Sequence, residues 1–113
     1  MLREDRIGIQ HMLDAINEAL TFTKGHQKDD LYQNRILVLS LIKEIEIIGE
    51  AASKVTEKTK TRYPQIPWKE MISIRNRLIH VYFDVDLERV CDTIQIDLPE
   101  LKSLIEPILK SRI

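Results

Sequence analysis

The sequence predicts an all-α protein, an up-and-down bundle of four or five helices in which residues 1–113 form a single domain. Apolar residues recur along most of the chain at the three- and four-residue spacing of an amphipathic helix. Only three glycines and four prolines interrupt it, which leaves little sequence for hairpins or linkers. A hydrophobic fraction of 43% and a charged fraction of 31% supply one core and a well-solvated surface.

A first helix is expected from about Arg3 to Lys24. Its apolar face is formed by Leu2, Ile9, Met12, Leu13, Ile16 and Leu20, which keep one helical phase. Gly25 suits the position just after the end of this helix. The polar segment that follows is typical of a turn and separates the first helix from the next.

A long second helix is expected to begin with Asp29 or Asp30 as its N-cap and to end near Lys60. Residues 36–48 are apolar nearly all round the helix, which predicts a central helix buried on several sides. Its polar strip consists of Ser40, Lys43, Glu44, Glu46, Glu50, Lys54 and Glu57. Gly49 costs about 1 kcal/mol of helix propensity relative to alanine, so it indicates the close approach of another backbone.

The third helix should open after Pro67 and run from Trp68 to Tyr82. Its apolar side is formed by Trp68, Met71, Ile72, Leu78 and Ile79, and Arg75 falls on that same side. A guanidinium group keeps its charge and is very costly to bury alone, so Arg75 requires a partner.

Two carboxylates of the second helix are candidates for that partner. Glu46 and Glu50 are neighbours of like charge on one helix face, an arrangement that favours a nearby cation. Either of them can support Arg75. The alternative is a solvated face on which Glu50 pairs with Lys54, and the sequence leaves both interpretations open.

A fourth helix is expected after Asp86, which can cap it. A single apolar phase runs through Leu87, Val90, Cys91, Ile94, Leu98, Leu101, Ile105, Ile108 and Leu109. Pro99 should kink this helix or restart it, with Asp97 as a local cap, without loss of the apolar face.

Composition narrows the classes of function. The net charge is −1, so affinity for nucleic acid must come from a local patch. The single cysteine, Cys91, excludes an internal disulfide and fits a cytoplasmic protein. No apolar stretch suits a targeting segment or a membrane span. Neither metal-ligand spacing nor a glycine-rich phosphate loop is present, so no metal or cofactor is expected.

The remaining polar residues of the third helix favour phosphate chemistry. Arginine binds phosphate and stabilises its charge in a transition state, and histidine moves protons near neutral pH. Arg75 and His80 could therefore cleave RNA without a metal, with the 2′-hydroxyl as nucleophile. The alternative for His80 is a helix-end residue that interacts favourably with the helix dipole.

The geometry of one straight helix opposes this chemistry. Asn76 and His80 are neighbours at i, i+4, whereas Arg75 and His80 lie about 140° apart around a helix. The two side chains can converge if the helix loosens at His80. They can also converge if a second copy of the chain supplies the other half of the site.

The segment Arg75-Asn76-Arg77-Leu78-Ile79-His80-Val81-Tyr82 resembles the Arg-x4-His-x-Tyr motif, with Asn after the arginine, of HEPN-domain proteins. The resemblance is specifically to HepT-like toxins. It extends to residues 46–52, 66–68 and 98–101, and thus covers most of the chain.

The resemblance implies a dimeric helical bundle that brings two motifs into one cleft. It also implies a metal-independent endoribonuclease, the toxin of a type VII-like toxin–antitoxin pair, with Arg75, Asn76 and His80 as catalytic residues. The partner would be a minimal nucleotidyltransferase antitoxin that silences the toxin by transferring AMP to Tyr82. The other interpretation of Tyr82 is a buried ring with a hydrogen-bonded hydroxyl.

A second class of function stays open because many functions share one fold. The same bundle could be a non-catalytic module that binds a nucleotide, or an adaptor that docks a nucleotidyltransferase. RNA degradation by the purified protein in EDTA, with a His80→Ala control, distinguishes the two classes.

Overall fold

A computed structural model describes residues 1–81 and 84–111 of the chain. Of Arg75, Ile79–Val81 and Asp84 it describes the backbone alone. The helices in chain order are α1 (Arg3–Thr23), α2 (Lys28–Gln33), α3 (Arg35–Lys54), α4 (Glu57–Arg62), α5 (Trp68–Leu78), α6 (Leu87–Asp92), the π-helical turn η1 (Thr93–Asp97) and α7 (Leu98–Lys110). Two short strands, β1 (Ile79–Val81) and β2 (Asp84–Val85), follow α5.

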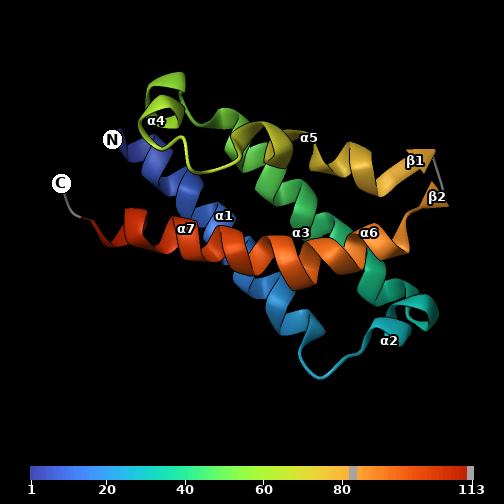
Figure 1. Ribbon diagram of the computed structural model, residues 1–113. Helices are drawn as coiled ribbons and strands as arrows, with labels where there is room; N and C mark the ends of the chain where they lie inside the picture. Colours follow the sequence, from blue (N-terminus) through green and yellow to red (C-terminus); the bar gives the residue numbers. More distant parts are fainter. Residues whose placement is uncertain (82–83, 112–113) are drawn as a thin grey trace.

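The hydrophobic core lies around α3. This helix packs against α1 on one side and α5 on another, and α7 packs on α1 (Figure 1). The largest fully buried side chains are Ile9, Met12, Ile16, Leu41, Ile45, Ile48, Ile66, Leu78, Leu98, Ile105, Val90 and Thr93. The all-α prediction is thus confirmed, with more and shorter helices than the four or five expected. None of the helices described is long and apolar enough to cross a membrane.

The two ends of the chain lie at the same end of the molecule (Figure 1). The Arg6 guanidinium joins them: its Nη1 donates to the Ser111 carbonyl at 3.0 Å, and its Nη2 donates to the Leu109 carbonyl. The strands β1 and β2, together with the end of α5, lie at the opposite end of the molecule.

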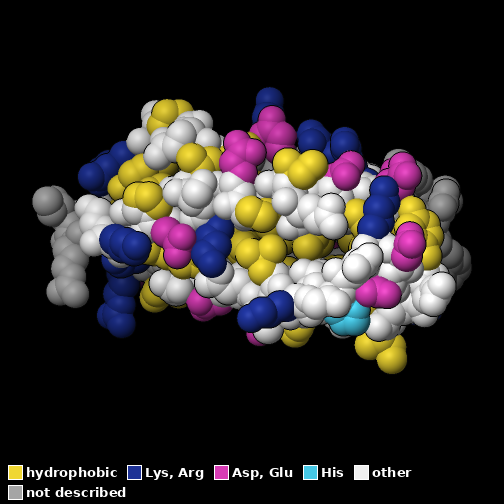
Figure 2. Space-filling model, turned by 60° about the horizontal axis from the view of Figure 1, so that its bottom comes forward, with side chains coloured by type: hydrophobic (Ala, Val, Ile, Leu, Met, Phe, Trp, Pro, Cys, Tyr) yellow, Lys and Arg dark blue, Asp and Glu magenta, His cyan; other side chains and the backbone are white. Residues whose placement is uncertain are grey.

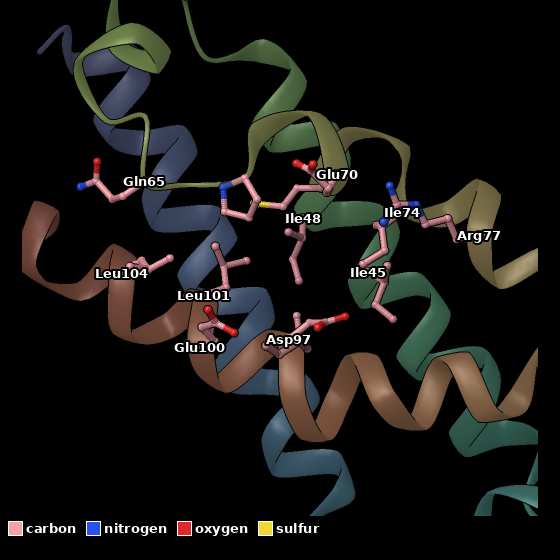
Figure 3. Close-up of a pocket in the computed structure, with 13 residues that line it drawn as sticks. Ile45, Ile48, Gln65, Glu70, Ile74, Arg77, Asp97, Glu100, Leu101 and Leu104 are labelled. Carbon is pink, nitrogen blue, oxygen red and sulfur yellow. The ribbon is translucent and has the colours of Figure 1, made fainter.

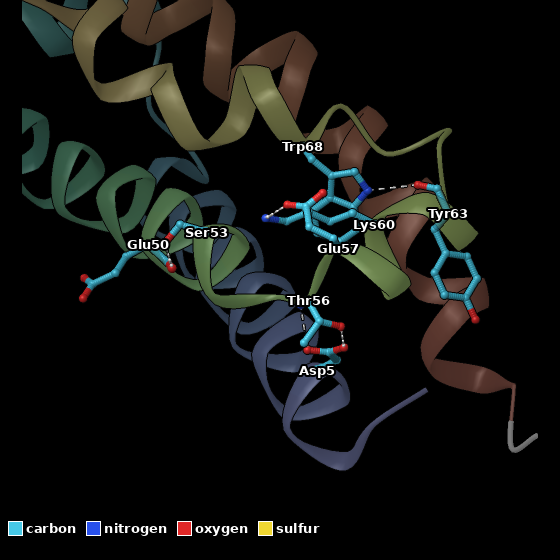
Figure 4. A network of polar contacts seen from close by, with 8 residues as sticks. All are labelled: Asp5, Glu50, Ser53, Thr56, Glu57, Lys60, Tyr63 and Trp68. Carbon is cyan, nitrogen blue, oxygen red and sulfur yellow. Dashed lines mark hydrogen bonds and ion pairs between the residues drawn. The ribbon is translucent and has the colours of Figure 1, made fainter.

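The prediction of one helix from Asp29 to Lys60 is wrong, because the chain breaks at two points. At the first, the Asn34 side chain accepts a hydrogen bond from the Leu37 N–H at 3.0 Å and starts α3. At the second, buried Asp5 of α1 accepts from the Thr56 N–H at 3.0 Å and from the Thr56 hydroxyl at 2.5 Å (Figure 4). It also accepts from the Thr59 hydroxyl at 2.6 Å. The Asp5 carboxylate therefore separates the end of α3 from the start of α4.

These hydrogen bonds also set the ionisation of Asp5. Burial acts to raise the pKa of its carboxyl group, but the hydrogen bonds from Thr56 and Thr59 favour the charged form more strongly. The resulting pKa lies below the ordinary value of an aspartate. The connection between α1 and α4 is therefore strongest when Asp5 is charged.

The prediction of a central helix buried on several sides is confirmed, because α1 and α5 pack on different sides of α3, but part of its apolar surface is exposed. Ile36 is 80% exposed and Leu39 is 48% exposed, on the side of α3 that faces away from the core. They border a shallow hollow with Phe22 and Lys43. Figure 2 likewise shows hydrophobic side chains along the middle of one face of the molecule, between charged ones.

The expected fourth helix forms, and Asp86 caps it by accepting from the Arg89 N–H at 3.0 Å. Pro99 lies in the first turn of α7, but the predicted cap is wrong, because the Asp97 side chain makes no capping hydrogen bond. Instead the chain passes through the π-helical turn η1 and continues as α7, with Asp97 itself helical at φ −71°, ψ −44°. Because Pro99 cannot donate a hydrogen bond, the wider π turn lets the helix continue past it.

The third helix is shorter than predicted, because α5 ends at Leu78. The Leu78 carbonyl accepts the Asp86 N–H at 2.7 Å, and β1 pairs antiparallel with β2, Ile79 opposite Val85. The β-branched residues Ile79 and Val81 favour the strand over another helical turn. A short hairpin therefore stands where the sequence predicted the end of a helix.

Candidate functional site

The site predicted from the sequence lies at the end of α5 and in the hairpin that follows. Arg75 and Asn76 belong to the last turn of α5, and Asn76 is exposed. His80 belongs to β1, so the helix ends between Arg75 and His80. The side chains of Arg75 and His80, and all of Tyr82, lie outside the part of the chain that the structure describes.

Arg75 and His80 do not lie on one straight helix, because the chain changes from helix to strand between them. The separation of about 140° between Arg75 and His80 holds only for one straight helix. The side chains of Arg75 and His80 were expected to converge if the helix loosened at His80. Because α5 ends at Leu78, the backbone meets this condition. The roles of Arg75, Asn76 and His80 remain predictions.

The start of α5 is held by the preceding turn. The Trp68 indole N–H donates to the Tyr63 carbonyl at 3.0 Å (Figure 4), and the Met71 N–H donates to the Pro67 carbonyl at 3.1 Å. Trp68 is buried, as the apolar side of this helix predicted, whereas Ile72 is 41% exposed. These contacts fix where the helix that carries Arg75 begins.

Gly49 determines how closely α5 lies on α3. A Cβ atom at this position would lie only 2.7 Å from the Met71 carbonyl oxygen and 3.5 Å from that of Ile72. The close backbone approach expected from the sequence is therefore confirmed. Gly49 thereby positions the middle of α5, directly before Arg75.

Glu46 and Glu50 lie beside this contact and line a hollow with Ile72 and Ile74. Glu50 Oε1 lies 3.6 Å from Lys54 Nζ, which is the ion pair of the solvated-face alternative. Its side chain points outward from α3 (Figure 4). Glu46 is half-buried. Support of Arg75 by either carboxylate stays a prediction.

Glu44 is a buried carboxyl group that the sequence analysis placed on the polar strip of its helix. It is 4% exposed, and no hydrogen-bond partner is found for its Oε2 among the described residues. Burial, together with the hydrogen bond and negative charge of Glu18 on α1, raises the pKa of Glu44 to about 7. The signal was its spacing: Leu41 and Ile48, three residues before and four after, are both core residues.

The raised pKa of Glu44 predicts a pH-dependent stability. Its folded-state pKa of about 7 lies above the ordinary 4.5, so the protonated form stabilises the fold. This contribution is present below pH 4.5 and is lost as the pH rises toward 7, a change of about 3 kcal/mol in the free energy of unfolding. Glu44→Gln should therefore match the parent protein near pH 4.5 and exceed it in urea denaturation at pH 8.

Glu57→Gln is the matched control, since the Glu57 side chain is 90% exposed. The difference in free energy of unfolding between Glu57→Gln and the parent protein should be the same at pH 4.5 and pH 8. A gain for Glu44→Gln that is equal at both pH values would contradict the assignment.

A second feature close to the motif is a groove between α5 and α7, with a volume of about 320 Å³ (Figure 3). Its polar residues include Arg77 from the motif segment and Asp97 from the end of η1. No role for Arg77 follows from the sequence pattern. Nothing in the helical pattern indicated the groove, because it depends on how α5 and α7 are placed relative to each other.

Comparisons with known proteins place these features in a family context. The family described as "Ribonuclease HepT-like" matches residues 12–108. The chain is 32% identical to "Putative RNase MJ1216" of Methanocaldococcus jannaschii, over 96% of this chain and 89% of that protein. It is 33% identical to "Probable ribonuclease HepT" of Thermococcus cleftensis, over 97% of this chain and 100% of that protein. No solved structure matches the chain.

Proposed function

The chain belongs to the ribonuclease HepT-like family, and we propose that it is a metal-independent endoribonuclease that uses Arg75, Asn76 and His80. The observation that carries this proposal is the family match, which spans residues 12–108 and so includes the whole Arg-x4-His-x-Tyr segment. Two relatives of nearly full mutual coverage are named as ribonucleases. The end of α5 between Arg75 and His80 is compatible with their convergence.

The proposed chemistry is an internal transesterification of RNA. His80 takes the proton of the ribose 2′-hydroxyl, whose oxygen attacks the adjacent phosphorus. The bond from phosphorus to the 5′-oxygen breaks, and that oxygen takes a proton from water, which gives a cyclic phosphate and a 5′-hydroxyl. The Arg75 guanidinium stabilises the charge on the phosphorane, and the exposed Asn76 amide can donate to the same phosphate.

The test is incubation of the purified protein with structured and unstructured RNA in excess EDTA. Cleavage with cyclic phosphate ends is the expected result. Intact RNA under all conditions would contradict the proposed chemistry, and cleavage that requires added Mg²⁺ would contradict its metal independence.

The proposed catalytic unit is a homodimer in which two motifs face each other across a twofold axis. This arrangement follows the family resemblance, and a twofold axis would bring two copies of the motif into one cleft. Sedimentation at micromolar concentration should give twice the monomer mass of 13.3 kDa. A monomer that still cleaves RNA would remove this part of the proposal.

We further propose that the protein is the toxin of a type VII-like pair, silenced when a minimal nucleotidyltransferase antitoxin transfers AMP to Tyr82. Tyr82 follows His80 by two residues in the sequence. AMP on its hydroxyl adds a negative phosphodiester and bulk close to groups that would otherwise receive the RNA phosphate.

Tyr82→Phe should stay active as a nuclease but resist silencing by the partner enzyme and ATP, because it lacks the acceptor hydroxyl. Mass spectrometry of the parent protein coexpressed with its partner should show AMP on the peptide that contains Tyr82. Modification of another residue, or full ATP-dependent silencing of Tyr82→Phe, would show that this mechanism is wrong.

A further inference from the structure

The groove between α5 and α7 has a shape that can accommodate an additional helix. α5 packs mainly on α3, whereas α7 packs mainly on α1, so the two helices diverge and leave a hollow of about 320 Å³ between them. Ile45 and Ile48 of α3 lie in the groove, and Figure 3 shows them between its two walls. The apolar floor is thus made by the central helix of the core.

Each wall of the groove is a single helical stripe. On α5 and the residue before it the wall is formed by Pro67, Glu70, Met71, Ile74 and Arg77, at spacings of three and four. On the opposite side it is formed by Asp97, Leu98, Glu100, Leu101 and Leu104, again at spacings of three and four. These stripes extend about 10 to 15 Å, which is two to three turns of a helix laid between them. Two such stripes on either side of an apolar floor are the geometry of helix-in-groove recognition.

The rim of the groove is acidic. Glu70 stands on the α5 side, and Glu100 and Asp97 stand on the α7 side (Figure 3). Among the lining residues whose side chains the structure describes, Arg77 is the single cation. This excess of carboxylates favours a positively charged occupant and repels the phosphates of RNA. An occupant must therefore combine an apolar face with basic flanks.

We propose that the α5–α7 groove docks a basic amphipathic helix of a partner protein. Its apolar face would lie on Ile45, Ile48 and Leu101, and its lysines or arginines would pair with Glu70 and Glu100 across the rim. Because α5 also carries Arg75, the partner helix would contact the same helix as the proposed catalytic motif. The docking goes beyond the proposed ribonuclease activity and does not depend on it.

The experiment measures binding of a fluorescent fourteen-residue helical peptide, with leucines on one face and lysines and arginines beside them, by anisotropy. The peptide should bind the parent protein at least tenfold more tightly than a scrambled peptide of equal composition. Glu70→Arg combined with Glu100→Arg should weaken binding at least tenfold. A second peptide carries glutamates in place of the basic residues. The double variant should bind this acidic peptide more tightly than the parent protein does.

Glu4→Arg combined with Glu57→Arg is the matched control, with an equal change of charge at exposed positions outside the groove. This pair should leave binding of the basic peptide unchanged within twofold. A similar loss in the control pair would mean general charge attraction and overturn the proposal.

Methionine methyl groups give a readout of the site that needs no substitution. Met71 lines the groove, whereas Met12 is fully buried in the core. With ¹³C-labelled methionine methyls, the basic peptide should shift the Met71 signal and leave that of Met12 in place. Equal affinity for the scrambled peptide, or saturation without a Met71 shift, would overturn the docking proposal, whatever the outcome of the RNA cleavage assay.

Discussion

Arg75→Ala and His80→Ala are each expected to lower the rate of RNA cleavage by a factor of about 10²–10⁴. The first substitution removes the positive charge that stabilises the negatively charged phosphorane, and the second removes the group that moves protons. Arg75→Lys should restore little activity, because lysine lacks the planar fork that binds phosphate through two hydrogen bonds. The measurement is initial cleavage rate in EDTA, with far-ultraviolet circular dichroism to check the helical content.

Arg77→Ala is the matched control for Arg75→Ala. Arg77 lies two residues further along α5, is exposed and belongs to the rim of the α5–α7 groove. It should retain most of the activity under the same conditions. If Arg75→Ala instead loses activity and helical content in equal measure, Arg75 has a structural role on α5 and the catalytic assignment fails.

Gly49→Ala is expected to reduce the free energy of unfolding, although alanine is the better helix former. The added Cβ would lie 2.7 Å from the Met71 carbonyl oxygen, so α5 must move away from α3. Such overpacking costs about 1–3 kcal/mol, against a gain in helix propensity of about 1 kcal/mol. Urea denaturation should show a net loss, and RNA cleavage should fall as well, because the displaced helix carries Arg75.

Gly8→Ala separates this steric effect from helix propensity. Gly8 also lies inside a helix, but a Cβ there would meet Val55 Cγ2 at 3.7 Å and the Ala51 carbonyl at 3.8 Å, which are ordinary contacts. This variant should be as stable as the parent protein or up to about 1 kcal/mol more stable. Destabilisation of both variants to the same extent would contradict the special role of Gly49.

Local sequence signals predicted structural features correctly where the contacts that produce those features join residues close along the chain. The apolar phase of the first helix predicted α1 to within a residue at its C-terminal end. Asp86 was predicted as a cap and accepts from the Arg89 N–H three residues later. Gly49 indicated a close backbone approach, since glycine inside a strongly helical segment is unfavourable unless space requires it. The motif around Arg75 indicated the family that the comparisons then showed.

The second break in the predicted long helix, at residues 54–57, was missed because it depends on a distant residue. Helical periodicity continues through residues 54–57, and no local proline stops it. The helix ends because Asp5, fifty-one residues earlier, accepts hydrogen bonds from the Thr56 N–H and hydroxyl. A carboxylate brought in by α1 offers the backbone a partner that the helix itself cannot, and only the packed structure contains that partner.

The sequence by itself determined the helical class, the apolar faces and the family motif, because periodicity and residue order are properties of the chain alone. Only the tertiary structure decided that α5 ends at Leu78, because the Asp86 N–H donates a hydrogen bond to the Leu78 carbonyl and β1 pairs with β2 beyond it. It also decided that Glu44 is buried against α1 and that a groove opens between α5 and α7. These features arise from contacts between helices distant in sequence, whose placement no local pattern specifies.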